Sequence, residues 1–175
     1  VVCDAADCPP EDPDVYIIVG NASVSDNFAS VPISYTSSAT LQLMRTNNLG
    51  GIQFHISDDP DVAVAVDFAP ADDAFMASYN DNPNGDGDVI GLFFSFTGDV
   101  LPATDEETVF ATLTYELTSD LSAGDIIDLN IYDVVCADAN GLELSSIGVD
   151  GSISSGSMPG DVNGDGSINV QDIIL

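Results

Sequence analysis

The segment Thr108-Val-Phe-Ala-Thr-Leu-Thr-Tyr-Glu-Leu117 alternates apolar and polar residues along its whole length. Val109, Ala111, Leu113 and Tyr115 fall on one side of the alternation, and mostly threonine falls on the other. A repeat of two residues is the period of a β-strand, in which successive side chains point to opposite faces of a sheet. The segment therefore predicts a strand with one face buried in an apolar core.

Similar runs recur along the chain, separated by clusters of Gly, Asn, Asp and Pro that are typical of turns. They cover residues 15–19, a run with Phe28, Val31, Ile33 and Tyr35, and residues 50–56, 62–66, 74–79, 89–96, 126–135 and 147–153. Pro32 indicates an edge strand or a bulge in the second run, because proline has no N–H for a ladder. Eight to ten strands with a turn about every ten residues indicate an all-β sandwich.

The composition is extremely acidic, with 30 Asp and Glu against a single basic residue, Arg45, and a formal net charge of −29. Such a surface repels nucleic acid and anionic membranes, and it attracts divalent cations. No apolar run is long enough to span a bilayer as a helix. The apolar share of 45% excludes a disordered tail. We interpret the charge as an adaptation to a saline exterior, which predicts an extracellular or cell-surface protein.

The C-terminal stretch 161–175 places oxygen-bearing residues at the spacing of a calcium loop. Positions one, three, five, seven, nine and twelve are Asp161, Asn163, Asp165, Ser167, Asn169 and Asp172. Glycine stands at position six, where a calcium loop turns sharply, and Ser167 would offer its backbone carbonyl. The spacing predicts Ca²⁺ as the bound ion, although the twelfth residue is Asp where an EF-hand has Glu.

A second Asn/Asp-rich loop, residues 80–88, repeats part of this spacing. Asn82, Asn84 and Asp86 match the first three ligand positions, but the twelfth position is Phe93, which has no oxygen to offer. We interpret it as a solvated hairpin loop.

The chain has three cysteines, which allow one disulfide and one free thiol. Cys3 and Cys8 can close a small local loop, which we favour, or one of them can join Cys136. The remaining thiol is expected to be a small buried apolar residue.

Residues for catalysis are scarce. The only histidine, His55, alternates with Phe54 and Ile56 in a predicted strand, so it faces away from them. No Gly-x-Ser-x-Gly elbow occurs, and one histidine with scattered thiols does not make a zinc site. We expect a protein that is not an enzyme.

Two parts of the chain resemble known families. Gly50-Gly51-Ile52-Gln53-Phe54 with Asp58-Asp59, and the segments 89–98, 110–115, 124–129, 137–141 and 149–151, resemble in order the strands of cohesin domains. Gly160-Asp-Val-Asn-Gly-Asp-Gly166, followed by Ile168-Asn169 and Asp172, resembles one calcium repeat of a type I dockerin. The resemblance implies a nine-stranded jelly-roll sandwich that is a binding module, with a sheet face as its partner surface.

The expected organisation is an N-terminal leader (1–14), a cohesin-like sandwich (15–154), a linker (155–160) and a dockerin-like calcium repeat (161–175). Dockerins have two such repeats, so we expect the second repeat either in a longer form of this chain or on another chain. Because receptor and ligand share one chain, we expect copies of this chain to join head to tail into extracellular filaments. The alternatives are a scaffold module for dockerin-bearing carbohydrate-active enzymes, and a calcium-stabilised carbohydrate-binding or adhesive sandwich.

Overall fold

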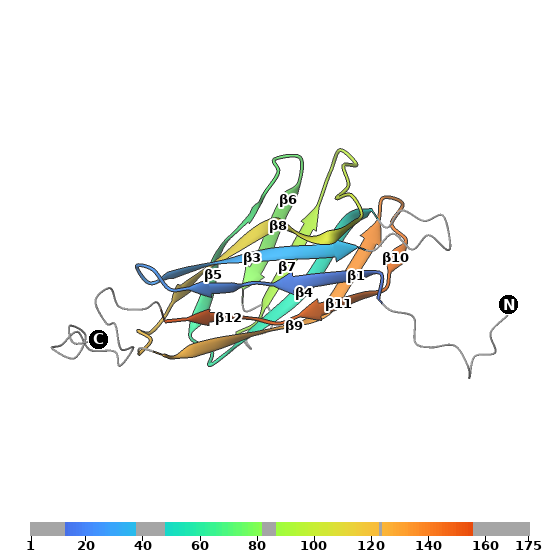
Figure 1. Cartoon of the computed structure of the whole chain (residues 1–175). Helices are drawn as coiled ribbons and strands as arrows, with labels where there is room; N and C mark the ends of the chain where they lie inside the picture. The colour runs from blue at the N-terminus through green and yellow to red at the C-terminus, as the bar shows by residue number, and fades with distance from the viewer. Residues whose placement is uncertain (1–12, 38–47, 82–86, 123, 156–175) are drawn as a thin grey trace, which may run out of the picture.

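Two β-sheets pack face to face and bury the apolar side of each predicted strand (Figure 1). The computed structural model describes residues 13–37, 48–81, 87–122 and 124–155. Sheet A has the order β11 (Ser146–Val149), β1 (Val15–Val19), β3 (Phe28–Ser37), β8 (Thr104–Leu117), β5 (Ala63–Pro70). Sheet B has the order β2 (Asn21–Ser23), β12 (Gly151–Ser154), β9 (Ile126–Asp138), β4 (Leu49–Asp59), β7 (Val89–Phe94), β6 (Met76–Asp81), and β10 (Glu143–Leu144) pairs with β9. The predicted all-β sandwich is confirmed.

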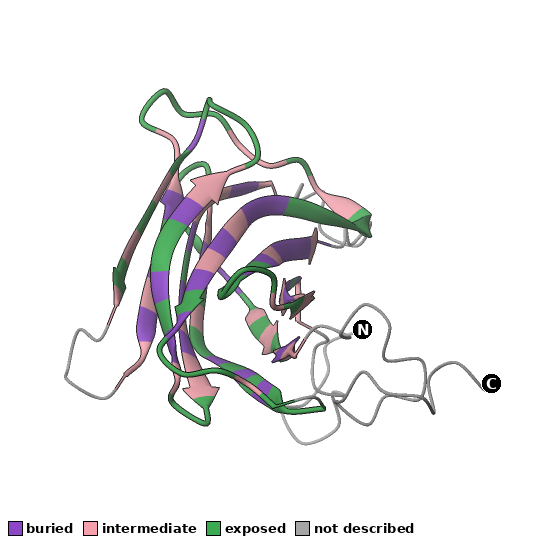
Figure 2. Ribbon diagram, turned by 90° about the vertical axis from the view of Figure 1, so that its left-hand side faces the viewer, coloured by how far each residue is buried: buried purple, intermediate pink, exposed green. Residues whose placement is uncertain are grey.

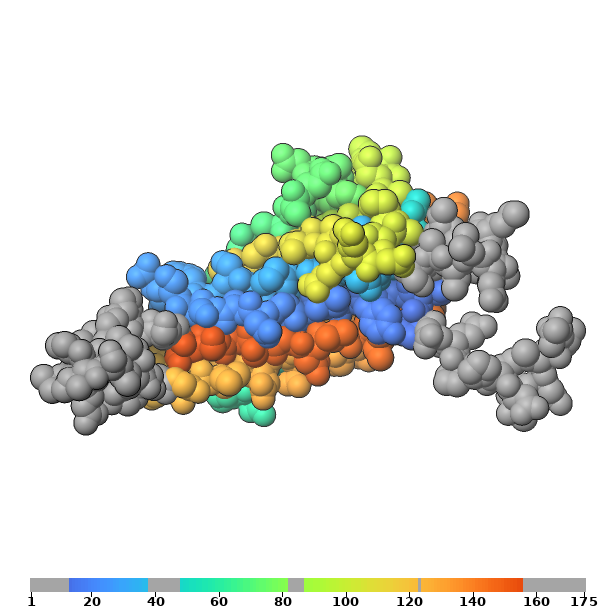
Figure 3. Space-filling model, viewed as in Figure 1, coloured from blue at the N-terminus to red at the C-terminus, as the bar shows by residue number. Residues whose placement is uncertain are grey.

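Among the described residues there are more strands than the nine expected, in part because both ends of the domain change sheet. β1 and β11 run parallel in sheet A, and their continuations β2 and β12 run parallel in sheet B. The predicted strand 147–153 is therefore two strands, interrupted at Asp150. The crossing requires glycine at Gly151, since a Cβ there would lie 2.3 Å from the carbonyl oxygen of Gly20. Figure 3 shows the first and last strands side by side.

The core lies between the sheets, and buried and exposed residues alternate along the strands (Figure 2). Phe93 lies at its centre, with ring centroids 4.8 Å from both Phe75 and Phe110. Phe54 packs edge-on against Phe68 at 5.8 Å. Full burial of each such ring stabilises the fold by roughly 1.5–3 kcal/mol.

The prediction that Val109 shares the buried side of β8 is wrong. Ile33 pairs with Ala111 and Ser34 pairs with Val109, so Phe110 is an extra residue in the ladder. Such a bulge reverses the side on which the following residues point. As a result Phe110 and Ala111 are both buried, while Val109 is exposed.

Pro32 lies in β3, which is an inner strand of sheet A and not an edge. Its backbone carbonyl accepts the N–H of Gly20, and the ladder with β8 shifts register just after Ile33. Of the two alternatives predicted from Pro32, an edge strand or a bulge, the structure has the bulge, which follows Ile33.

The described chain enters and leaves the sandwich at opposite ends of its long axis. β1 begins at one end, and β12 finishes at the other (Figure 1). The described part of the chain contains no helix with the length and apolar character needed to cross a bilayer.

Candidate protein-interaction face

The outer side of sheet B is built by four neighbouring strands whose outward residues lie in register. Gln53 of β4 pairs with Leu92 of β7 on one side and with Val135 of β9 on the other. Leu92 in turn pairs with Ser78 of β6. We define the neutral face as the outward residues Gly51, Gln53, His55, Ser57, Met76, Ser78, Asn80, Ile90, Leu92, Phe94, Asn130, Tyr132, Val135 and Ala137.

None of these residues carries a charge when His55 is neutral, although the chain contains 30 acidic residues. The exposed carboxylates of the same strands are Asp59 and Asp128, which pair directly across β4 and β9 at one end, and Asp133, at the bulge of β9. Carboxylates are therefore confined to the margin and the bulge of this surface.

Apolar side chains are exposed across the neutral face. Met76 is 50% exposed, Val135 44% and Leu92 40%. They are contributed by β6, β9 and β7, so the exposed apolar area spans the sheet and is not one isolated residue. Exposed apolar side chains surrounded by polar residues are typical of a protein-binding surface.

His55 lies near the middle of the neutral face, and the alternation of β4 predicts its position on the side opposite Phe54 and Ile56. Its ring centroid is 5.2 Å from that of Tyr132, its partner across β9. The hydroxyl group of Tyr132 donates a hydrogen bond to Asp88, in the connection before β7. This bond holds the tyrosine ring, so the two rings form an ordered part of the surface.

A loop after β7, which is closed by its own hydrogen bonds, presents an aromatic ring at the corner of the neutral face. Ser95 Oγ accepts the backbone N–H groups of Thr97 and Asp99, each at 3.2 Å, and it donates to the Asp99 carboxylate at 3.1 Å. Hydrogen bonds from Thr97 and Ser95 hold the pKa of Asp99 below its usual value. Phe96 is 80% exposed, and its ring stacks edge-on against Phe94 with centroids 4.8 Å apart.

Two other carboxylates, Asp58 of β4 and Asp81 of β6, join sheet B to the edge strand β5 of sheet A, and we call this junction the seam. Asp58 Oδ2 accepts the backbone N–H groups of Val62 and Ala63, both at 2.9 Å, and Asp81 Oδ1 accepts that of Ala65 at 3.1 Å. β5 is the edge strand of sheet A, so these bonds satisfy N–H groups that would otherwise invite another strand.

This seam also contains polar groups in an unfavourable environment. Burial is the main reason that the pKa of Asp58 is raised. Burial, with Asp58 and Asp81 nearby, also raises the pKa of Tyr115, whose hydroxyl group is buried without a hydrogen-bond partner. Among the residues that the structure describes, no group of three or more His, Cys, Asp or Glu side chains is placed to hold a metal ion.

The predicted calcium ligands Asp161 to Asp172 lie outside the described residues, as do Cys3, Cys8 and residues 82–86 of the second loop. Phe93, at the twelfth position of that loop, is buried in the core. Cys136 is a free, buried thiol whose pKa is raised to about 12 by burial, which matches the expectation of an inert apolar cysteine.

The neutral face itself was not predicted residue by residue. Each of its strands alternates as expected, but uncharged outward residues in one strand are unremarkable. The uncharged surface can be recognised only when the strand register places four such strands next to one another.

No protein-family model matches the chain, and no curated protein matches it in sequence. Similar solved structures do exist, and they are cohesins. One belongs to a type I cohesin–dockerin complex from Clostridium thermocellum, with a TM-score of 0.59, 21% identity and coverage of 81% of this chain and 98% of that chain.

A second similar structure is that of CaCohA2 from Clostridium acetobutylicum, with a TM-score of 0.57, 21% identity and coverage of 84% and 94%. A third is a non-cellulosomal cohesin from the hyperthermophilic archaeon Archaeoglobus fulgidus, with a TM-score of 0.57, 14% identity and coverage of 82% of this chain and 92% of that chain. At these identities the likeness shows that the described residues have the cohesin fold.

Proposed function

We propose that this chain is a secreted, non-enzymatic assembly protein that binds a partner protein through the neutral face of sheet B. The observation that carries the proposal is the neutral face itself. Two strongly acidic surfaces repel each other when they approach, so an acidic protein associates most easily through a surface with few carboxylates. Met76, Leu92 and Val135 supply apolar area on that surface.

The fold supports a binding module. The structure from Clostridium thermocellum is that of a cohesin in complex with a dockerin, and this chain has the same fold together with a C-terminal segment that resembles a dockerin repeat. We propose that residues 161–175 bind Ca²⁺ through the six predicted ligands, and that the calcium-loaded segment of one copy docks on the neutral face of another.

The direction of the chain supports assembly between copies. β1 begins at one end of the sandwich and β12 finishes at the other, so the described domain starts and finishes at opposite ends of its long axis (Figure 1). A contact between two different surfaces of identical subunits does not close on itself unless the rotation forms a ring, and otherwise it gives a filament. Head-to-tail filaments are therefore the proposed product.

A second candidate function is a scaffold module that binds dockerins carried by separate enzymes. The specific observation in its favour is that several of the similar cohesins were solved in complexes with dockerins from other chains. Both functions use the neutral face, and they differ in the partner.

The decisive experiment compares Leu92→Asp with a matched control, Ile147→Asp, by light scattering and negative-stain microscopy in calcium and in chelator. Both residues are exposed apolar strand residues, but Leu92 lies on the neutral face and Ile147 on sheet A. We expect long particles from the unmodified protein in calcium, from Ile147→Asp as well, and none from Leu92→Asp.

Filaments from Leu92→Asp as abundant as those from the unmodified protein would refute the role of the neutral face. Monomers of the unmodified protein in calcium, together with capture of dockerin-bearing enzymes that Leu92→Asp abolishes, would favour the scaffold module.

A further inference from the structure

Two adjacent glycines at the start of β4 differ in what the fold requires of them. A Cβ on Gly50 would lie 2.7 Å from the carbonyl oxygen of Asp138 and 3.0 Å from the Cα of Ala139. The close approach of the backbone at Asp138 therefore demands glycine at position 50.

Gly51 has no such requirement. The nearest atom to a Cβ at this position would be the carbonyl oxygen of Phe93, at an ordinary contact distance of 3.9 Å, and its φ angle is not in the left-handed region. A glycine inside a strand weakens the strand, because it has no side chain to pack and it loses more entropy on folding. Since the fold does not need this glycine, its open space is available to another molecule.

The surroundings of Gly51 form a step in the neutral face. Across β7 its neighbour is Phe94, which pairs in turn with Met76, and across β9 its neighbour is Ala137. Along this row, side-chain size decreases from the large apolar side chains of Met76 and Phe94 to Gly51, which has none, and the next residue, Ala137, has only a methyl group. Phe96 stacks on Phe94 and extends the apolar wall. We call this arrangement the Gly51 step.

We propose that the Gly51 step receives an aliphatic side chain of the docking partner, and that its occupant is the apolar run at residues 173–175 of the C-terminal segment, from another copy. This inference rests on the proposed function. The segment 161–175 has no aromatic and no basic residue, and its three aspartates would be repelled by an acidic surface. Its Ile-Ile-Leu run at residues 173–175 matches an uncharged step with an aromatic wall.

A size series at position 51 tests the step in the full-length protein. We expect Gly51→Ala to weaken calcium-dependent association modestly, and Gly51→Leu to weaken it by about tenfold or more, because the added side chain fills the space of the occupant. The measurement is the apparent Kd from sedimentation equilibrium in calcium. The thermal unfolding temperature of each variant at position 51 should equal or exceed that of the unmodified protein, since there is room for a side chain at this position.

Gly50→Ala is the structural control, and we expect it to destabilise the fold because its Cβ would collide with backbone atoms. Association of Gly51→Leu equal to that of the unmodified protein would refute the step. If Leu92→Asp still abolishes association in that case, binding through the neutral face is supported and only the role of the Gly51 step is refuted. If Leu92→Asp has no effect either, the proposed function fails with it.

The occupant is tested by combining Gly51→Leu with Ile173→Ala and Ile174→Ala. We expect the losses in association to be non-additive, because the truncated side chains no longer enter the filled step. Strictly additive losses would refute the assignment of residues 173–175 as the occupant.

Discussion

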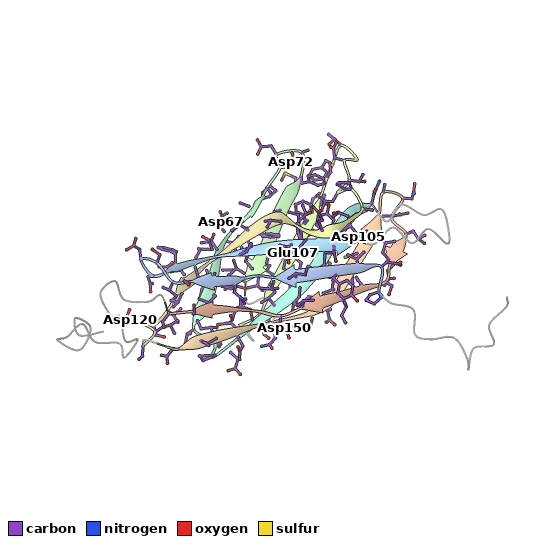
Figure 4. All side chains as sticks on the ribbon, viewed as in Figure 1. Asp67, Asp72, Asp105, Glu107, Asp120 and Asp150 are labelled. Carbon is purple, nitrogen blue, oxygen red and sulfur yellow. The ribbon has the colours of Figure 1, made fainter. Side chains whose placement is uncertain are left out.

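The outer faces of the two sheets have the same secondary structure and opposite surface chemistry. Sheet A displays carboxylates, among them Asp67, Asp105 and Glu107 (Figure 4), together with Glu116 of β8. Sheet B displays the neutral face. Both sheets also expose apolar residues, so apolar exposure by itself does not distinguish them. The distribution of charge does.

The difference shows how a very acidic protein keeps one surface available for binding. Carboxylates on sheet A keep that face hydrated and repel other copies. The neutral face lacks this repulsion, and its apolar side chains are released from water when a partner covers them. Solubility and association can therefore be assigned to opposite sides of one sandwich.

The largest expected effect is the difference in stability loss between a substitution on the inner side of β7 and one on its outer side. Phe93→Ala removes a ring packed between Phe75 and Phe110 and should lower the free energy of unfolding by about 3–5 kcal/mol. Leu92→Ala, one residue away on the outer side, should change it by about 0.5 kcal/mol or less. Urea denaturation of both variants measures the contrast, and equal losses would mean that Leu92 is not a surface residue.

A smaller effect concerns Asp58, a carboxylate that serves the fold. Its pKa is raised above the ordinary value of 3.8, chiefly by burial, so the folded protein holds this proton more tightly than the unfolded chain does. Its contribution to stability is therefore greatest below pH 3.8 and is lost as the pH rises through the folded pKa. Asp58→Asn keeps a carbonyl oxygen for the Val62 and Ala63 N–H groups and has no charge to bury.

We expect Asp58→Asn to gain stability relative to the unmodified protein as the pH rises from below 4 to about 6.5. The measurement is the difference between their urea midpoints at the two pH values, and Asp58→Ala, which lacks the acceptor, is the control. A difference that does not change with pH would contradict the raised pKa.

The smallest expected effect on stability, about 0.5 kcal/mol or less, is that of Phe96→Ala, because the ring is 80% exposed. Association in calcium should nevertheless weaken by about tenfold if the ring forms the wall of a binding surface. Phe28→Ala, which truncates an exposed phenylalanine of sheet A, is the matched control and should leave association unchanged. Equal effects of the two substitutions on association would remove the distinction between the faces.

Local sequence patterns predicted most strands, because a two-residue period directly encodes which side of a strand is buried. The errors occurred where a partner strand altered the period. Val109 changed sides because of the bulge at Phe110, and the strand at 147–153 divided at Asp150, where the chain changes sheet. A bulge and a crossing depend on contacts with distant strands, which a local pattern does not contain.

By itself, the sequence determined the all-β class, the acidic character, the outward position of His55 and the calcium-type spacing of residues 161–172, because composition and spacing are local properties. Only the tertiary structure decided that uncharged residues from β4, β6, β7 and β9 share one face, and that Gly50 is required while Gly51 is not. The physical reason is that these properties depend on which strands pair and how closely their backbones approach. Both are set by packing between segments far apart in the chain.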